Sequence, residues 1–213
     1  MRNIGFLFDL DGVLIDSEKE YTRIWDKIEE KYPTGKKDFA NSIKGQTLTL
    51  ILQENYNIET RELVTKELHR LEEEMTYTYC RGAEALLHRL HEANCNTAVV
   101  TSSDGKKMSH LFKDLPEFKN KVKVIIDAER VTRSKPDPEG YTLAAKDLDI
   151  NIAKCVVFED SVQGVRAGRA SGAYVIGITG TKTREELIPY SDMVIDSLQE
   201  IDLANLSQIL RER

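Results

Sequence analysis

With 213 residues, of which 40% are hydrophobic and 31% charged, the chain can bury one large core and a second, smaller domain. It has no apolar run near the roughly 20 residues of a membrane-spanning helix and no secretory signal before Asp9, so we expect a cytoplasmic protein. A net charge of −6 argues against non-specific nucleic-acid binding, and three scattered cysteines argue against a disulfide framework or a zinc site. A monomer is the default expectation.

Six short apolar runs rich in β-branched and aromatic residues predict buried strands. They lie at 4–8, 97–100, 122–126, 155–158, 174–178 and 193–195. From the second run onward the strands alternate with helical segments such as 83–93 and 139–148, which is typical of βαβ units. The sequence therefore predicts an α/β fold with a three-layer, parallel-sheet, Rossmann-like core.

Two carboxylates, Asp9 and Asp11, directly follow the first predicted strand. Residues i and i+2 of an extended chain face the same side, so both would lie at the carboxyl edge of the sheet, where open α/β folds bind ligands. The tripeptide itself carries little information, because 147–149 repeats it at the end of a predicted helix. Its position after a strand makes Asp9 and Asp11 candidate site residues.

About 90 residues without a convincing strand separate the first two predicted strands, whereas a parallel connection needs one helix. They include a long helical pattern at 60–79. The surplus predicts a separate helical domain at 17–80, inserted between core segments 1–16 and 81–213. Hinges would lie near Asp16 and at 80–82.

The second strand ends in Thr101-Ser102-Ser103, ahead of a helix that starts near Gly105. Hydroxyls and unpaired backbone amides at such a point can bind an anion, although they can equally cap the helix. Further along, two prolines hold Lys135 in a stiff loop before another helix. A lone loop lysine is usually solvated, so Lys135 gains meaning only from its neighbours at the sheet edge.

The fourth strand ends in the acid pair Glu159-Asp160, and acid pairs at strand ends are commonly metal ligands. If Asp9, Asp11, Glu159 and Asp160 meet Lys135, the group carries a charge of about −3 and requires a cation. Oxygen ligands beside a phosphate favour Mg²⁺ over zinc.

Such a site could transfer a phosphoryl group. The metal, Lys135 and Thr101 would hold the phosphate oxygens. Asp9 could attack phosphorus in line, and Asp11 could protonate the leaving oxygen and later deprotonate water.

In this order, the motifs resemble those of the haloacid dehalogenase-like hydrolase superfamily, in the phosphatase branch that carries a helical cap after the first strand. The resemblance spans nearly the whole chain and implies a Mg²⁺-dependent phosphatase acting on a small phosphorylated metabolite. It implies that Asp9 is the nucleophile and Asp11 the acid/base. It also implies that Thr101 binds the phosphate and Lys135 fixes it, and that Mg²⁺ is held by Asp9, Asp160 and the Asp11 carbonyl, with Glu159 in or near that shell.

A β-phosphoglucomutase-like sugar phosphomutase is the first alternative. Those relatives use a histidine and an arginine of the cap. Here the histidine position falls at Tyr21, and the residues after Gly45 offer no arginine. A neutral phenol is a poor proton relay near pH 7, so the phosphatase is favoured.

A dehalogenase is the second alternative. Its family pattern has the nucleophile without an acid two residues later, whereas this chain has Asp11. Displacing a halide needs no such acid, so Asp11 argues against this activity.

A phosphoryl-receiver signalling domain is the third alternative, since it also gathers acids, a threonine and a lysine in an α/β sheet. Receivers place the acid pair early and the phosphorylated aspartate in mid-chain. The order is reversed here, and the helical insert is foreign to a receiver.

The cap is expected to select the substrate, because the catalytic groups contact only the phosphoryl group. Tyr21, Lys44, Gly45 and Gln46 are the candidate pocket residues, since they align with the family's specificity segments. Arg81 stands where relatives often place proline. Sugar phosphates, other phosphomonoesters and pyrophosphate all remain open as substrates.

Overall fold

The computed structural model describes residues 3–43 and 48–212 and divides the chain into two compact units. One comprises 1–16 with 77–213, and the other comprises 17–76. The second boundary thus lies earlier than the expected 80/81. The reason is that 77–80 run along the first loop of the core: the Asp16 N–H donates to the Thr78 carbonyl (2.9 Å), and Ile15 forms a bridge with Tyr79.

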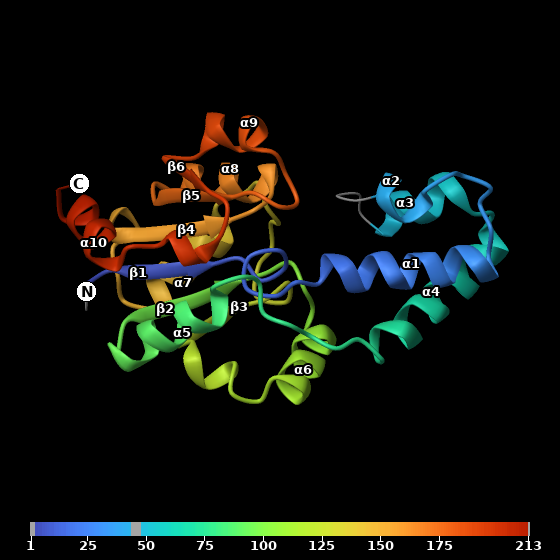
Figure 1. Ribbon diagram of the computed structural model, residues 1–213, viewed down its shortest axis with the longest axis horizontal. Coiled ribbons are helices and arrows are strands. Elements are labelled where there is room, and N and C mark those ends of the chain that lie inside the picture. The colour runs from blue at the N-terminus through green and yellow to red at the C-terminus, as the bar shows by residue number, and fades with distance from the viewer. Residues whose placement is uncertain (1–2, 44–47, 213) are drawn as a thin grey trace. The chain divides into compact units, whose positions relative to one another are not determined.

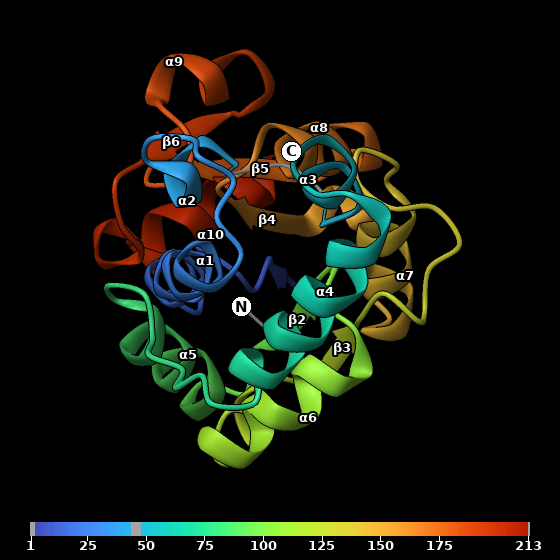
Figure 2. The ribbon, with the colours of Figure 1, turned by 90° about the vertical axis from the view of Figure 1, so that its right-hand side faces the viewer.

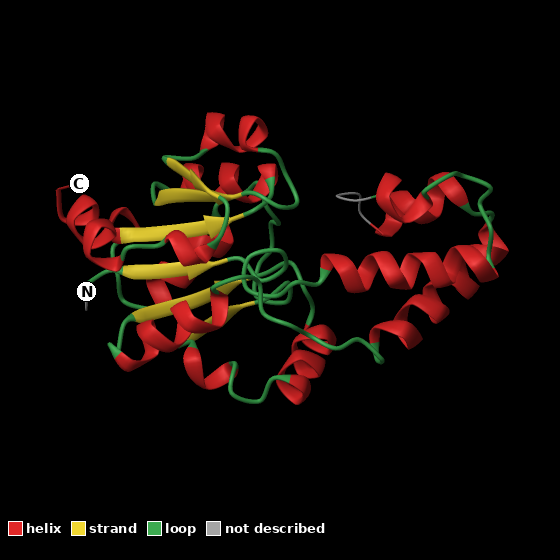
Figure 3. Ribbon diagram, viewed as in Figure 1, coloured by secondary structure: helices red, strands yellow, loops and turns green. Residues whose placement is uncertain are grey.

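The larger unit contains a six-stranded parallel sheet, as the sequence predicts (Figures 1 and 3). In chain order its strands are β1 (Gly5–Phe8), β2 (Asn96–Val100), β3 (Val124–Ile126), β4 (Cys155–Glu159), β5 (Tyr174–Ile178) and β6 (Met193–Ile195). The spatial order is β3-β2-β1-β4-β5-β6. Strand β1 therefore lies between β2 and β4, which brings the ends of these three strands together.

Helices cover both faces of the sheet. They are α5 (Ala83–Glu92), α6 (Gly105–Asp114), α7 (Glu139–Asp147), α8 (Val162–Ser171), α9 (Arg184–Leu187) and α10 (Leu203–Glu212). Short 3₁₀ turns lie at Lys119–Lys121, Ile152–Lys154, Ile188–Tyr190 and Leu198–Glu200. Figure 2 shows α7 and α8 on one side of the sheet and α5 and α10 on the other. With both faces covered, every residue of β1 and β4 is buried, and the Phe8 ring stacks on Phe158 with centroids 4.5 Å apart.

The smaller unit is helical and has a core of its own. It contains α1 (Glu18–Lys31), α2 (Phe39–Ser42), α3 (Leu48–Asn55) and α4 (Ile58–Glu72). Trp25 packs edge-on against Phe39, with ring centroids 5.9 Å apart. Helix α4 ends at Glu72, before the predicted 79, and 77–80 belong to the core unit. None of the described helices combines the length and the apolar character that crossing a bilayer requires.

Candidate active site

Three carboxylates meet at the carboxyl edge of the sheet. Asp9 follows β1, and Glu159 and Asp160 lie at the end of β4. The strands are in register, with Phe8 beside Phe158, and the Asp9 N–H donates to the Phe158 carbonyl (3.0 Å). Each of the three residues offers an oxygen within 4.8 Å of the others, and all three are buried. Strand pairing thus builds an acidic cluster from residues 150 positions apart in the chain.

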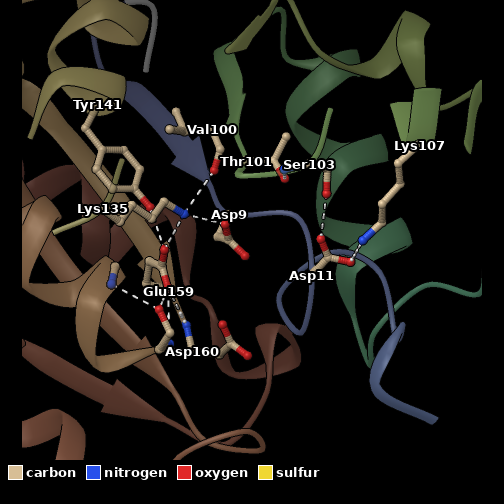
Figure 4. A network of polar contacts seen from close by, with 12 residues as sticks. Asp9, Asp11, Val100, Thr101, Ser103, Lys107, Lys135, Tyr141, Glu159 and Asp160 are labelled. Atoms are coloured by element: carbon tan, nitrogen blue, oxygen red, sulfur yellow. Dashed lines mark hydrogen bonds and ion pairs between the residues drawn. The ribbon is translucent and has the colours of Figure 1, made fainter. Parts of the chain in front are cut away.

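Lys135 is the cation inside this cluster (Figure 4). Its Nζ donates to Asp9 Oδ1, to Glu159 Oε1 (2.5 Å) and to the Val100 carbonyl (3.1 Å). Burial by itself would lower the pKa of Lys135, but the Asp9 and Glu159 carboxylates outweigh it and raise that pKa well above its ordinary value. Lys135 is therefore a permanent positive charge in direct contact with Asp9.

Glu159 is fully buried, and donors engage both of its oxygens. Lys135 and the Tyr141 hydroxyl (3.0 Å) donate to Oε1. The backbone N–H groups of Asp160 and Ser161 (both 3.1 Å) and the Ser161 hydroxyl (3.0 Å) donate to Oε2. Helix α8 also packs against the carboxylate, since a Cβ at Gly164 would lie 1.7 Å from Oε1. This carboxylate is built to hold Lys135 and the loop after β4.

The surroundings of Asp9 and Asp160 favour the protonated form of both carboxyl groups. Burial raises the pKa of Asp9 to about 7; Lys135 opposes this increase, while Glu159 and Asp11 add to it. Burial, then Glu159 and Asp9, likewise raise the pKa of Asp160 well above its ordinary value. The Thr181 hydroxyl donates to Asp160 Oδ2, and Gly12, with φ +77°, brings the loop after β1 against the same oxygen. Two carboxylates in this state fit a divalent cation, and their all-oxygen donors suit a hard ion such as Mg²⁺.

Asp11 points to the opposite side of the site from Lys135 (Figure 4). The Ser103 hydroxyl donates to its Oδ2 (3.0 Å), and Lys107 Nζ donates to its Oδ1 (2.7 Å). Asp11 therefore belongs to the same edge of the sheet but not to the cluster around Lys135.

The segment after β2 lies between these two groups. Thr101 is buried, and its hydroxyl oxygen accepts from the Ser103 N–H (3.0 Å), whereas the neighbouring Ser102 is exposed. A cavity of about 40 Å³ is lined by Thr101, Ser102 and Lys135, among others. It has room for a few waters, not for a whole metabolite. Three of the residues predicted to bind phosphate, Thr101, Ser102 and Lys135, thus line one small recess, while Ser103 faces Asp11.

The sequence reasoning missed Tyr141, Thr181 and Lys107, which touch Glu159, Asp160 and Asp11 respectively. Tyr141 and Thr181 come from α7 and from the loop after β5, and no motif singles them out. Lys107 had a usable signal, because it lies on the first turn of the helix that begins beside Thr101. Of the predicted pocket residues, Tyr21 donates to Glu72 Oε1 (3.0 Å) within the helical unit, and 44–46 lie outside the described residues.

Comparison with known proteins decides the family. The model of the haloacid dehalogenase-like hydrolases matches residues 5–172. The chain belongs to this family. The resemblance inferred from the sequence is thereby confirmed, and the enzyme is a hydrolase of this superfamily with phosphatases among its relatives.

Two relatives illustrate this. Hexitol phosphatase A of Escherichia coli is 33% identical over 208 residues, which cover 94% of each chain. Validoxylamine A 7'-phosphate phosphatase of Streptomyces hygroscopicus is 27% identical over 202 residues, which cover 92% of this chain and 94% of that one.

Solved structures confirm the predicted fold. A HAD hydrolase, family IA, variant 3, from Entamoeba histolytica has a TM-score of 0.80 at 23% identity and covers 99% of this chain and 100% of its own. The β-phosphoglucomutase of Clostridium difficile has a TM-score of 0.77 at 24% identity and covers 100% of this chain and 98% of its own. At these identities the likeness concerns the fold alone.

Proposed function

We propose that this hydrolase removes phosphate from a small phosphorylated metabolite, such as a sugar or sugar-alcohol phosphate, through an aspartyl-phosphate on Asp9. The observation that carries the proposal is the buried Asp9 carboxylate, bonded to Lys135 and within 4.8 Å of Asp160. Hexitol phosphatase A and the yeast 2-deoxyglucose-6-phosphate phosphatase 1, which is 28% identical over 221 residues, support this substrate class.

Asp9 and Asp160 would hold Mg²⁺ in this proposal, together with the Asp11 carbonyl that the family resemblance implies. When bound, the ion would neutralise the carboxylates and the incoming phosphate. Glu159, which the sequence placed among the metal ligands, would act through Lys135 instead, because five donors already engage its oxygens.

The chain's own residues then account for both half-reactions. An Asp9 oxygen attacks phosphorus while Lys135 holds a phosphoryl oxygen and the 101–103 segment donates to the others. Asp11 gives a proton to the leaving oxygen, which departs as an alcohol. Asp11 then takes a proton from water, the water oxygen attacks phosphorus, and the bond to Asp9 breaks, so that inorganic phosphate leaves.

A substrate screen tests the function. We expect phosphate release from hexose or hexitol phosphates in the presence of Mg²⁺ and its loss with EDTA. Phosphate release should be measured for sugar phosphates, nucleotides and pyrophosphate, and phosphorus NMR of β-glucose 1-phosphate should separate hydrolysis from isomerisation. Failure to release phosphate from any of them, or undiminished release with EDTA, would contradict the proposal, and a sugar bisphosphate intermediate would favour the mutase.

Mg²⁺ binding should depend on pH. Since the pKa of Asp9 is about 7, the carboxyl must lose a proton to bind the ion at lower pH. The affinity should rise by about tenfold per pH unit from about pH 5 to 7 through the Asp9 proton, and the raised pKa of Asp160 should make the rise steeper. The stability of the metal-free protein should change in the opposite direction. The unfolded chain loses the Asp9 proton near pH 3.8, whereas the folded chain keeps it up to about pH 7. The free energy of unfolding should therefore fall as the pH rises from about 4 to 7. Titration calorimetry and metal-free thermal unfolding across this range measure both, and flat profiles would contradict the assignment.

A further inference from the structure

Lys107 and Ser103 both donate hydrogen bonds to the Asp11 carboxylate. Lys107 Nζ lies 2.7 Å from Oδ1, and the Ser103 hydroxyl lies 3.0 Å from Oδ2, so each oxygen has its own donor (Figure 4). The Lys107 side chain is 17% exposed and that of Asp11 is 33% exposed. The pair is thus partly shielded, and a charge-assisted bond in such a place is stronger than a surface ion pair.

The placement of Lys107 contradicts the local preference of its helix. Lys107 is on the first turn of α6, where the positive end of the helix dipole disfavours a cation. The Asp104 side chain caps this turn by accepting from the Lys107 N–H (2.9 Å), which fixes the point from which the lysine side chain departs. A residue that breaks a local rule and meets a site carboxylate suggests a functional purpose.

The location of Asp11 suits a group that serves the leaving oxygen. In-line transfer places the attacking and leaving oxygens on opposite sides of phosphorus. An acid for the leaving oxygen must therefore stand across the phosphoryl group from Asp9, not beside it. Figure 4 shows Asp11 separated from Asp9, with its carboxylate directed towards Ser103 and Lys107.

We propose that Lys107 is a positioning residue that keeps the Asp11 carboxylate on the leaving-group side of the site. The inference rests on the proposed function. Lys107 contacts no reacting atom in this scheme; it removes the freedom of Asp11 to turn into solvent. The loss of kcat on removing Lys107 should therefore be larger for a leaving group that needs a proton than for one that leaves as a stable anion.

The test compares two leaving groups in Lys107→Met. An alkyl phosphate, such as a sugar phosphate, needs a proton to leave, whereas p-nitrophenyl phosphate releases a stable anion. We expect kcat for the alkyl phosphate to fall about tenfold, at least five times more than for the aryl phosphate, with KM changed less than about twofold. Lys107→Arg should recover most of the loss, because arginine keeps a charged donor. Lys106→Met is the matched control, since this exposed neighbour lies on the same turn and carries the same charge.

Thermal unfolding of each variant shows that it is folded. Equal losses for both leaving groups, an unchanged kcat for both, or an identical loss in Lys106→Met would overturn the role of Lys107. Failure of the proposed function looks different, because the wild-type protein would then hydrolyse neither ester.

Discussion

Asp9→Asn should lower kcat by about 10⁴-fold or more while leaving the protein folded. The amide is nearly the same size as the carboxylate but is a far weaker nucleophile. Asn can still face Lys135, and Glu159 continues to balance the charge of that lysine. The measurement is steady-state phosphate release from the best substrate, with thermal unfolding as the check on folding.

Asp149→Asn is the matched control for this substitution. The same tripeptide recurs at 147–149, and Asp149 is its second aspartate. Asp149 is exposed and lies just after the end of α7. Its left-handed backbone (φ 55°) is one that asparagine tolerates, so activity should be retained. Mass spectrometry of acid-quenched enzyme should find the phosphoryl group on the peptide that contains Asp9. Wild-type turnover in Asp9→Asn, or a phosphoryl group elsewhere, would refute the nucleophile.

Lys135→Met should lower both the activity and the free energy of unfolding. It leaves Asp9 and Glu159 buried without the cation that now bonds to both, and breaking a buried ion pair from one side costs about 3 kcal/mol or more. Activity should fall by about 10³-fold, because the phosphoryl group loses its fixed positive partner. Denaturant unfolding of the wild type and the variant at the same pH gives the stability, and phosphate release gives the activity.

Two variants separate these effects. Lys106→Met makes the same chemical change at an exposed position and should alter the free energy of unfolding by less than about 0.5 kcal/mol. The double variant Lys135→Met/Glu159→Gln removes one stranded charge, so it should regain part of the stability without regaining activity. A Lys135→Met protein as stable as the wild type would mean that Lys135 does not balance the charge of the cluster. An active double variant would mean that Lys135 does not bind the phosphoryl group.

The sheet could be predicted because its strands are buried on both faces. Such strands are short apolar runs between polar turns, and the alternation with helices fixes a parallel order. The boundary at 76/77 could not be predicted, since nothing local in 77–80 distinguishes the end of a helical domain from a segment that pairs with the loop after β1. That pairing is a tertiary contact between residues more than 60 positions apart.

In the candidate site, too, the positions of the residues could be predicted and their hydrogen-bond partners could not. Asp9, Lys135, Glu159 and Asp160 each follow a strand or a proline-fixed loop, so their meeting follows from topology. What the individual groups do depends on hydrogen bonds that a sequence does not display. The five donors on Glu159 are the reason we propose that it supports Lys135, and one of them, Tyr141, comes from a helix face that the sequence pattern assigns to the core.

The bridge between Ile15 and Tyr79 has a consequence for how such proteins diversify. The chain departs from the sheet unit after Asp16 and returns at Tyr77, and the hydrogen bond from Asp16 to Thr78 holds these two points together. The intervening 17–76 can therefore be exchanged for another module of any size whose two ends meet. Under the proposed function, such an exchange would change which molecule is accepted while Asp9, Lys135 and Asp160 keep their places in the sheet unit.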